Sequence, residues 1–201
     1  MDRIHNIQKL TDNPFVNLYQ LSVQHRDGTQ GPYYVASRRR DVQSIRASRH
    51  DDQPDGVILY GVYGPQKDQL VLIRQYRYPI DDYVYEFPAG LVEEGEDAQD
   101  AAIREMYEET GLTFQPRPAG FRSRPFFTTV GLTDESCATV YGYCQEIPTN
   151  CHQEGSEDIQ VVLADRDEAR RILAEEKVAI MCAFHLMHFI ASQGDPLAFL
   201  D

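Results

Sequence analysis

Cysteine is scarce in this chain, and its spacing does not suggest a metal centre. The sequence contains Cys137, Cys144, Cys151 and Cys182, with no pair separated by two residues. Zinc sites in proteins are usually built from such closely spaced pairs, so we expect no zinc site. Free thiols are typical of proteins kept in a reducing compartment, and we therefore expect the cytoplasm.

Long apolar runs and basic residues are also in short supply. No apolar segment approaches the ~20 residues of a membrane span. The N-terminal stretch lacks a basic start followed by an apolar core, so we expect a soluble protein without a targeting signal. The formal net charge of -13 argues against nucleic-acid and anionic-membrane partners. A phosphate-bearing substrate would then need metal ions to be held.

Composition divides the chain of 201 residues into a small N-terminal part and a larger second part. Residues 15–37 hold alternating apolar positions around Asp27-Gly28, which predicts a β-hairpin, and the polar segment 41–55 predicts a linker. We expect an N-terminal β-element over residues 1–50 and a main domain over residues 56–201. An isolated hairpin is marginal in water, so the element needs cover from the main domain or from another subunit.

The main domain alternates strands and helices. Strands are predicted at 57–63, 69–76, 83–87, 126–130, 137–143 and 159–163, and closing helices at 166–175 and 178–192. A mixed sheet with helices before and after it makes the fold class α/β, a layered α/β/α sandwich.

An acidic helix lies between these strands. Glu105, Glu108 and Glu109 are at positions i, i+3 and i+4, so their carboxylates share one face of one turn. Like charges so placed repel, which is reasonable where a cation binds, and clustered oxygen ligands suit Mg²⁺ or Mn²⁺. The acidic segment 94–97 predicts the start of this helix, and Gly111 predicts its end.

The segment from Gly90 to Leu112 resembles the signature of the Nudix hydrolases, G-x5-E-x7-R-E-U-x-E-E-x-G-U, where U is apolar. The matching residues are Gly90, Glu96, Arg104, Glu105, Met106, Glu108, Glu109, Gly111 and Leu112. The resemblance implies a Nudix-type sandwich and hydrolysis of a nucleoside diphosphate linked to another group. It also implies about two to three Mg²⁺ or Mn²⁺ ions at the signature helix.

Roles for single residues follow from the same resemblance. Glu105 and Glu109 are implied as the principal metal ligands, with help from Glu108 and the backbone carbonyl of Ala89. Arg104 is implied to orient the glutamates within the catalytic machinery, and Glu96 to hold the loop before the helix.

Residues before the signature narrow the substrate. The stretch Arg74 to Pro79, RQYRYP, and the stretch Glu86 to Gly90, EFPAG, resemble segments of the ADP-ribose and nucleoside diphosphate sugar pyrophosphatases. By this resemblance Arg74, Arg77 and Glu86 are substrate-binding, and ADP-ribose is hydrolysed to AMP and ribose 5-phosphate. Members of that group resemble intertwined homodimers, so a homodimer is implied. Val130-Gly131 departs from the proline-glycine pair common in that group.

Other functions stay open at this point. Hydrolysis of GDP-mannose or UDP-glucose is an alternative within the enzyme class, and a non-catalytic Nudix-fold module that binds a nucleotide is an alternative outside it. The three retained glutamates favour an enzyme.

The general base is expected on an acidic loop, because the signature glutamates are used on metals. Glu154 is the first candidate and Glu157 the second, since ADP-ribose pyrophosphatases carry a catalytic glutamate on the corresponding loop. Glu135, after Gly131, is the remaining alternative.

Overall fold

The computed structural model describes residues 3–149, 153 and 158–201. The chain forms two compact units. Residues 1–55 and 125–137 belong to the first unit, and residues 56–124 and 138–201 belong to the second. The segment 125–137, which follows the signature helix in sequence, therefore belongs to the unit that contains the N-terminus.

The first unit is built on a three-stranded antiparallel sheet. Its strands are β1 (Ile4–Lys9), β2 (Asn17–Gln24) and β3 (Gln30–Ser37), in the order β1-β2-β3. The sheet has one strand more than the predicted hairpin. A short helix, α1 (Arg46–Arg49), follows, and its predecessor Ile45 is buried against Tyr19, Leu21 and Val35.

Residues 125–137 are bound to β3 within this unit. The backbone N–H of Ala36 donates to the carbonyl of Leu132 at 2.9 Å, and the Tyr33 hydroxyl donates to the carbonyl of Gly131 at 2.8 Å. Strand β9 (Phe126–Phe127) is shorter than the predicted strand 126–130. Positions 128–130 instead begin a turn, closed by the N–H of Leu132 donating to the carbonyl of Thr129.

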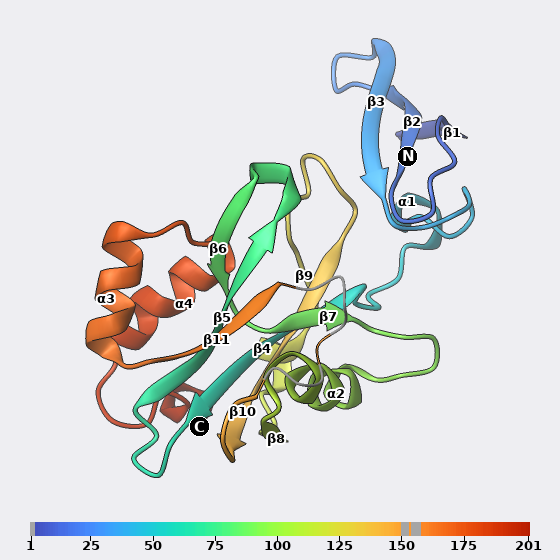
Figure 1. Ribbon diagram of the computed structural model, residues 1–201. Helices are drawn as coiled ribbons and strands as arrows, with labels where there is room; N and C mark the ends of the chain where they lie inside the picture. The colour runs from blue at the N-terminus through green and yellow to red at the C-terminus, as the bar shows by residue number, and fades with distance from the viewer. Residues whose placement is uncertain (1–2, 150–152, 154–157) are drawn as a thin grey trace. The chain divides into compact units, whose positions relative to one another are not determined.

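The second unit is a sheet with helices on both faces (Figure 1). The strand order is β11-β5-β4-β10-β8, with β6 beside β5 and β7 beside β4. The strands are β4 (Gly56–Tyr63), β5 (Gln69–Arg77), β6 (Asp82–Glu86), β7 (Ala89–Leu91), β8 (Thr113–Pro116), β10 (Ser136–Gln145) and β11 (Ile159–Ala164). The 3-10 turns are η1 (Tyr78–Ile80), η2 (Gly120–Ser123) and η3 (Ala198–Leu200). The predicted α/β/α class is confirmed.

A separate hydrophobic core lies on each face of this sheet. Helices α3 (Arg166–Glu175) and α4 (Ile180–Ala191) cover one face, and α2 (Ala98–Thr110) covers the other (Figure 1). Leu70 and Leu72 of β5 are buried on the α3–α4 side, and Val71 is buried on the α2 side. This alternation is the period-two pattern of a strand buried on both faces.

Candidate active site

Helix α2 begins where the sequence predicts. The side chain of Asp97 accepts hydrogen bonds from the backbone N–H groups of Gln99 and Asp100, at 2.8 and 2.9 Å. An N-cap of this kind satisfies N–H groups that have no partner inside the helix. Gly95, in the loop just before, has φ of 84°, a conformation that glycine adopts without strain.

Contacts from later residues complete the end of the helix. Gly111 has φ of 71°, and its N–H donates to the carbonyl of Tyr107. The backbone N–H of Thr149 donates to the carbonyl of Thr110 at 2.8 Å, and Nε2 of Gln153 donates to the carbonyl of Glu109 at 2.7 Å. Carbonyls that would lack a partner inside the helix are thus satisfied by residues from the segment before β11.

Gly90 and Glu105 are packed against each other. A Cβ placed on Gly90 would lie 1.9 Å from both Cδ and Oε1 of Glu105. Strand β7, which carries Gly90, pairs with β4 and holds the loop over the helix. The signature glycine is therefore required for space rather than for its backbone conformation.

Arg104 is the centre of an ionic network on the same face. Its guanidinium binds Glu96 through two nitrogens at 2.9 and 3.0 Å, Glu105 at 2.8 Å and Glu108 at 3.0 Å. The hydrogen bonds from Arg104 hold the pKa of Glu96 below its usual value. The same bonds, with Glu96 first, raise the pKa of Arg104, and partial burial opposes that rise. The arginine therefore joins the loop before the helix to the helix itself.

Glu109 is the most buried of the three helix glutamates. It is 3% exposed, and its Oε2 accepts a hydrogen bond from the backbone N–H of Ala89 at 3.1 Å. The side chain of Glu108, by contrast, is 46% exposed. A carboxylate buried this far needs compensating donors or a cation.

Arg77 and Glu86 form a bidentate ion pair at the ends of neighbouring strands. The two N···O distances are 2.7 and 3.0 Å. Alternation along β5 places Arg77 on the same face as Val71, which is the face covered by α2. Arg74 lies on the opposite face, with its guanidinium 4.0 Å from the ring centroid of Tyr83. Of the predicted substrate-binding residues, Arg77 and Glu86 are thus brought together, whereas Arg74 lies apart from them.

The chemistry of the signature residues fits a hard divalent cation. All side-chain donors are carboxylate oxygens on one turn, and the open space at Gly90 admits the carboxylate of Glu105. In the part of the chain that the structure describes, no three His, Cys, Asp or Glu side chains are grouped as a metal site. Arg104 forms ion pairs with both Glu105 and Glu108.

Of the three candidate general bases, the structure describes Glu135. Glu154 and Glu157 lie outside the described residues. Glu135, in the first unit, is bound by Arg38 at 2.7 Å and by the hydroxyl of Thr128 at 3.2 Å. Both contacts join Glu135 to other residues of the first unit.

Sequence reasoning missed Thr149 and Gln153 as partners of the signature helix. Both belong to a polar stretch without periodicity, so no sequence pattern could have shown that their groups reach the last turn of α2. The crowding at Gly111 is related, because a Cβ there would lie 2.2 Å from the Thr149 methyl carbon.

The NUDIX domain model matches residues 52–184 of this chain. The chain belongs to the Nudix family. The putative nudix hydrolase 2 of Caenorhabditis elegans is 32% identical over 181 residues, which cover 89% of this chain and 74% of that protein. The ADP-ribose pyrophosphatase of Saccharomyces cerevisiae is 35% identical over 151 residues, covering 72% of this chain and 60% of that protein.

A solved structure titled as an ADP compounds hydrolase shares the Nudix fold. It superposes with a TM-score of 0.61 at 17% identity, covering 86% of this chain and 82% of the other. The chain spans less than two thirds of the yeast relative.

Within the described ranges, none of the helices has the length and apolar character needed to cross a bilayer. The described cysteines Cys137, Cys144 and Cys182 are free thiols, as predicted, and Cys151 lies outside the described residues.

Proposed function

We propose that this Nudix hydrolase cleaves the pyrophosphate bond of a nucleoside diphosphate sugar, with ADP-ribose as the preferred substrate and AMP and ribose 5-phosphate as products. The observation that carries the proposal is the packing of Glu105 against Gly90, with Glu108 and Glu109 on the same turn. Relatives named ADP-ribose pyrophosphatase support the choice of substrate.

Glu105, Glu108 and Glu109, with the carbonyl of Ala89, would hold Mg²⁺ or Mn²⁺. When bound, such ions neutralise charge on the pyrophosphate and lower the pKa of the attacking water. Arg104 keeps the carboxylates of Glu105 and Glu108 in place, because one guanidinium bonds to both of them. Ordered ligands of this kind reduce the reorganisation needed in the transition state.

Arg77 and Glu86 are proposed to bind the substrate. Glu86 fixes the guanidinium of Arg77 by two hydrogen bonds, and Arg77 remains 44% exposed in its side chain. A fixed, accessible guanidinium suits the oxygens of a phosphate. A role for Arg74 in binding rests on the sequence resemblance alone.

Glu154 is proposed as the general base, with Glu157 as the second choice. The described residues beside them are held to the second unit. Gln153 donates to the carbonyl of Glu109, and the side chain of Asp158 accepts from the hydroxyl of Tyr83 at 2.6 Å. The assignment of the base to Glu154 or Glu157 rests on the sequence resemblance, because both residues lie outside the described ranges.

We also propose a cytoplasmic homodimer that uses the first unit. Phe15, Tyr33 and Tyr34 are 77%, 43% and 49% exposed there, and Leu18 is 38% exposed. The register of β2 and β3 places Leu18 and Tyr34 on one face of this sheet, and exposed apolar side chains that share a face are typical of a protein–protein interface. The N-terminal element would then cover the partner subunit, as the family resemblance implies.

The test of the proposed function is a substrate panel. ADP-ribose, GDP-mannose and UDP-glucose are incubated with Mg²⁺ or Mn²⁺, and phosphate is measured after phosphatase treatment of the products. We expect the highest kcat/KM for ADP-ribose. A higher value for GDP-mannose or UDP-glucose would move the assignment to that sugar nucleotide, and binding of ADP-ribose without turnover of any of them would identify a non-catalytic module.

A further inference from the structure

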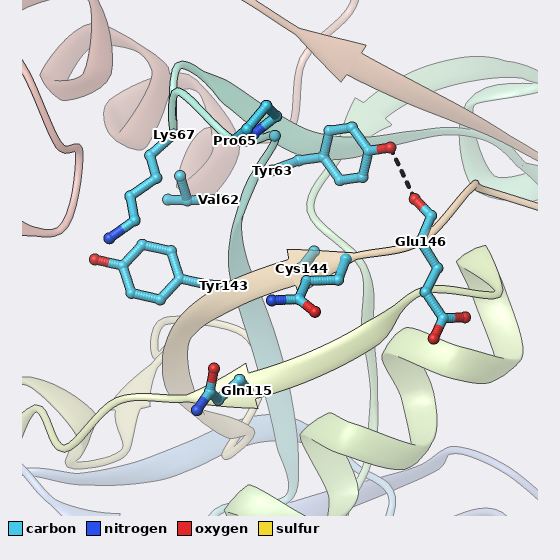
Figure 2. Close-up of a pocket in the computed structure, with 10 residues that line it drawn as sticks. Val62, Tyr63, Pro65, Lys67, Gln115, Tyr143, Cys144 and Glu146 are labelled. Carbon is cyan, nitrogen blue, oxygen red and sulfur yellow. Dashed lines mark hydrogen bonds between the residues drawn. The ribbon is translucent and has the colours of Figure 1, made fainter.

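A cavity of about 620 Å³ lies at the end of the second unit's sheet where β4 and β10 finish (Figure 2). It is lined by Val62, Tyr63, Gly64, Pro65, Lys67, Gln115, Tyr143, Cys144, Gln145 and Glu146. Its volume is within the range of small-molecule sites, roughly 300–1,000 Å³. Val62 is buried in the core on the α3–α4 side of the sheet and Cys144 in the core on the α2 side, so the cavity extends across the end of the sheet.

The cavity is separate from the signature residues. Gly90 pairs with Val57 near the start of β4, whereas Val62 near its end pairs with Leu70. Five residues of strand between Val57 and Val62 correspond to about 17 Å. A ligand in this cavity would therefore not occupy the proposed catalytic site.

Unusual backbone conformations mark the rim. Lys67 has φ of 54° and Glu146 has φ of 77°, and neither is glycine. Left-handed backbone at such residues costs on the order of 1 kcal/mol and is concentrated at functional sites. The ammonium of Lys67 lies over the ring of Tyr143, as Figure 2 shows, with Nζ 4.0 Å from the ring centroid.

The charge of Lys67 is already balanced. Its Nζ lies 3.4 Å from a carboxylate oxygen of Asp195, and the Tyr143 hydroxyl donates to the same oxygen at 2.5 Å. An anion entering the cavity would have to compete with Asp195 in a chain with a formal net charge of -13. The cavity is therefore better suited to a neutral ligand.

Three polar side chains on the rim have donors and acceptors that a ligand could use. Among the described residues, no hydrogen bond engages the carboxamides of Gln115 or Gln145 or the carboxylate of Glu146. The Tyr63 hydroxyl donates to the backbone carbonyl of Glu146 at 2.7 Å, which leaves that side chain available (Figure 2). Carboxamides pair with the edge of a purine base, carboxylates accept from ribose hydroxyls, and an aromatic ring stacks on a base.

We propose that this cavity is a second, non-catalytic site for a neutral nucleoside, with the base near the carboxamides of Gln115 and Gln145 and the ribose diol near Glu146. The site does not depend on the proposed pyrophosphatase activity, because a nucleoside has no pyrophosphate bond.

The experiment is calorimetric titration of adenosine into the full chain and into two tryptophan variants. Gln115→Trp fills the cavity from an exposed strand position. Gln66→Trp is the matched control, because Gln66 is exposed in the neighbouring turn and does not line the cavity. We expect Gln115→Trp to raise the Kd for adenosine at least about tenfold and Gln66→Trp to leave it unchanged. Circular dichroism checks that both variants fold.

Three further measurements test the class and place of the ligand. We expect 2′,3′-dideoxyadenosine to bind about tenfold more weakly than adenosine, and AMP to bind no more tightly than adenosine. Arg77→Ala is expected to leave adenosine binding intact. The proposal is overturned if wild-type protein does not bind adenosine, if Gln115→Trp binds it normally, or if Arg77→Ala abolishes binding. Tighter binding of AMP by tenfold or more would contradict the neutral-ligand assignment.

Discussion

The carboxylate of Glu105 occupies the space in which a side chain at Gly90 would begin, because a Cβ at that position would lie 1.9 Å from Oε1 of Glu105. The signature glycine and the signature glutamate are thus one structural feature, contributed by β7 and α2. The relationship explains why a spacing of fifteen residues between them, read from the sequence, carries information about a site.

Gly90→Ala is expected to lower kcat by at least about 10²-fold while the protein stays folded. The new methyl group meets the far end of a flexible side chain, so Glu105 rotates away and the backbone remains in place. The measurement is steady-state kinetics on the preferred substrate of the panel, together with a thermal unfolding curve.

Gly142→Ala is the matched comparison. A Cβ on Gly142 would lie 2.4 Å from the backbone carbonyl oxygen of Gln115, which cannot rotate away. This variant should lose about 1–3 kcal/mol of unfolding free energy and keep its activity per folded molecule. If Gly90→Ala also lost mainly stability and kept its turnover, the proposed contact with Glu105 would have no role in catalysis.

Glu109→Gln should lower kcat by at least about 10²-fold at saturating Mg²⁺ or Mn²⁺. The amide retains an oxygen that accepts from the N–H of Ala89, so folding is preserved while the negative charge is lost. Glu175→Gln, on the exposed surface of α3, is the control and should behave as wild type. Near-normal turnover of Glu109→Gln would show that the helix is not the metal site.

Single replacement of Glu154, Glu157 and Glu135 by Gln tests the general base. We expect Glu154→Gln to lose about 10²- to 10⁴-fold in kcat with KM little changed, because a base acts on the proton rather than on binding. Glu135→Gln should instead reduce stability modestly, since it weakens the ion pair with Arg38. A tenfold or greater loss of kcat in Glu135→Gln alone would move the base to the segment after Gly131.

The regular elements of the second unit could be predicted because their patterns are local. Helix α3 was predicted at its observed bounds, and β4, β5, β10 and β11 within one or two residues, since alternation and turn residues are explicit there. Strand β7 was missed because Ala89–Leu91 is a three-residue strand that pairs with β4, an arrangement set by tertiary contacts. Strand β8 was missed because it is short and ends in Pro116.

The sequence could predict those parts of the candidate site that depend on the spacing of residues within helix α2. The ion pair between Arg104 and Glu108 follows from positions i and i+4, and the end of α2 follows from Gly111. The bond from Gln153 to Glu109 joins residues 44 positions apart, and the bonds from residues 131 and 132 to β3 join even more distant ones. Local pattern carries no signal for such contacts, so they had to come from the structure.

Charged replacements on the exposed face of the first unit should dissociate the proposed homodimer. Phe15→Glu combined with Tyr34→Glu places like charges where apolar side chains are 77% and 49% exposed, and neither residue is part of the buried core of Tyr19, Leu21, Val35 and Ile45. We expect a monomer by light scattering and a loss of activity if the partner's element covers the site.

Deletion of residues 1–50 should have a larger effect than these point variants. It also removes β3 and therefore the partners of residues 131 and 132, so part of its effect would be local unfolding. A wild-type protein that is monomeric at micromolar concentration would contradict the homodimer.

His185 should make stability depend on pH below pH 6.5. Its ring lies 5.4 Å from the ring of Tyr60 and 5.5 Å from that of Phe87, and its Nδ1 donates to the carbonyl of Met181 at 2.8 Å. Burial lowers the pKa of His185 below its ordinary value of 6.5, an effect opposed by the bond to Met181.

Proton linkage determines whether the free energy of unfolding rises or falls with pH. Below pH 6.5 the unfolded chain binds a proton at His185 more readily than the folded protein does, so the free energy of unfolding falls as the pH falls through that window. Above it the contribution is fully present. His185→Asn keeps a donor for the Met181 carbonyl but does not titrate, so its Tm should fall less than that of wild type between pH 7.5 and about 5. His5→Asn, at an exposed position of β1, should follow wild type across the same range. Equal pH dependence in wild type and His185→Asn would show that this ring does not govern acid stability.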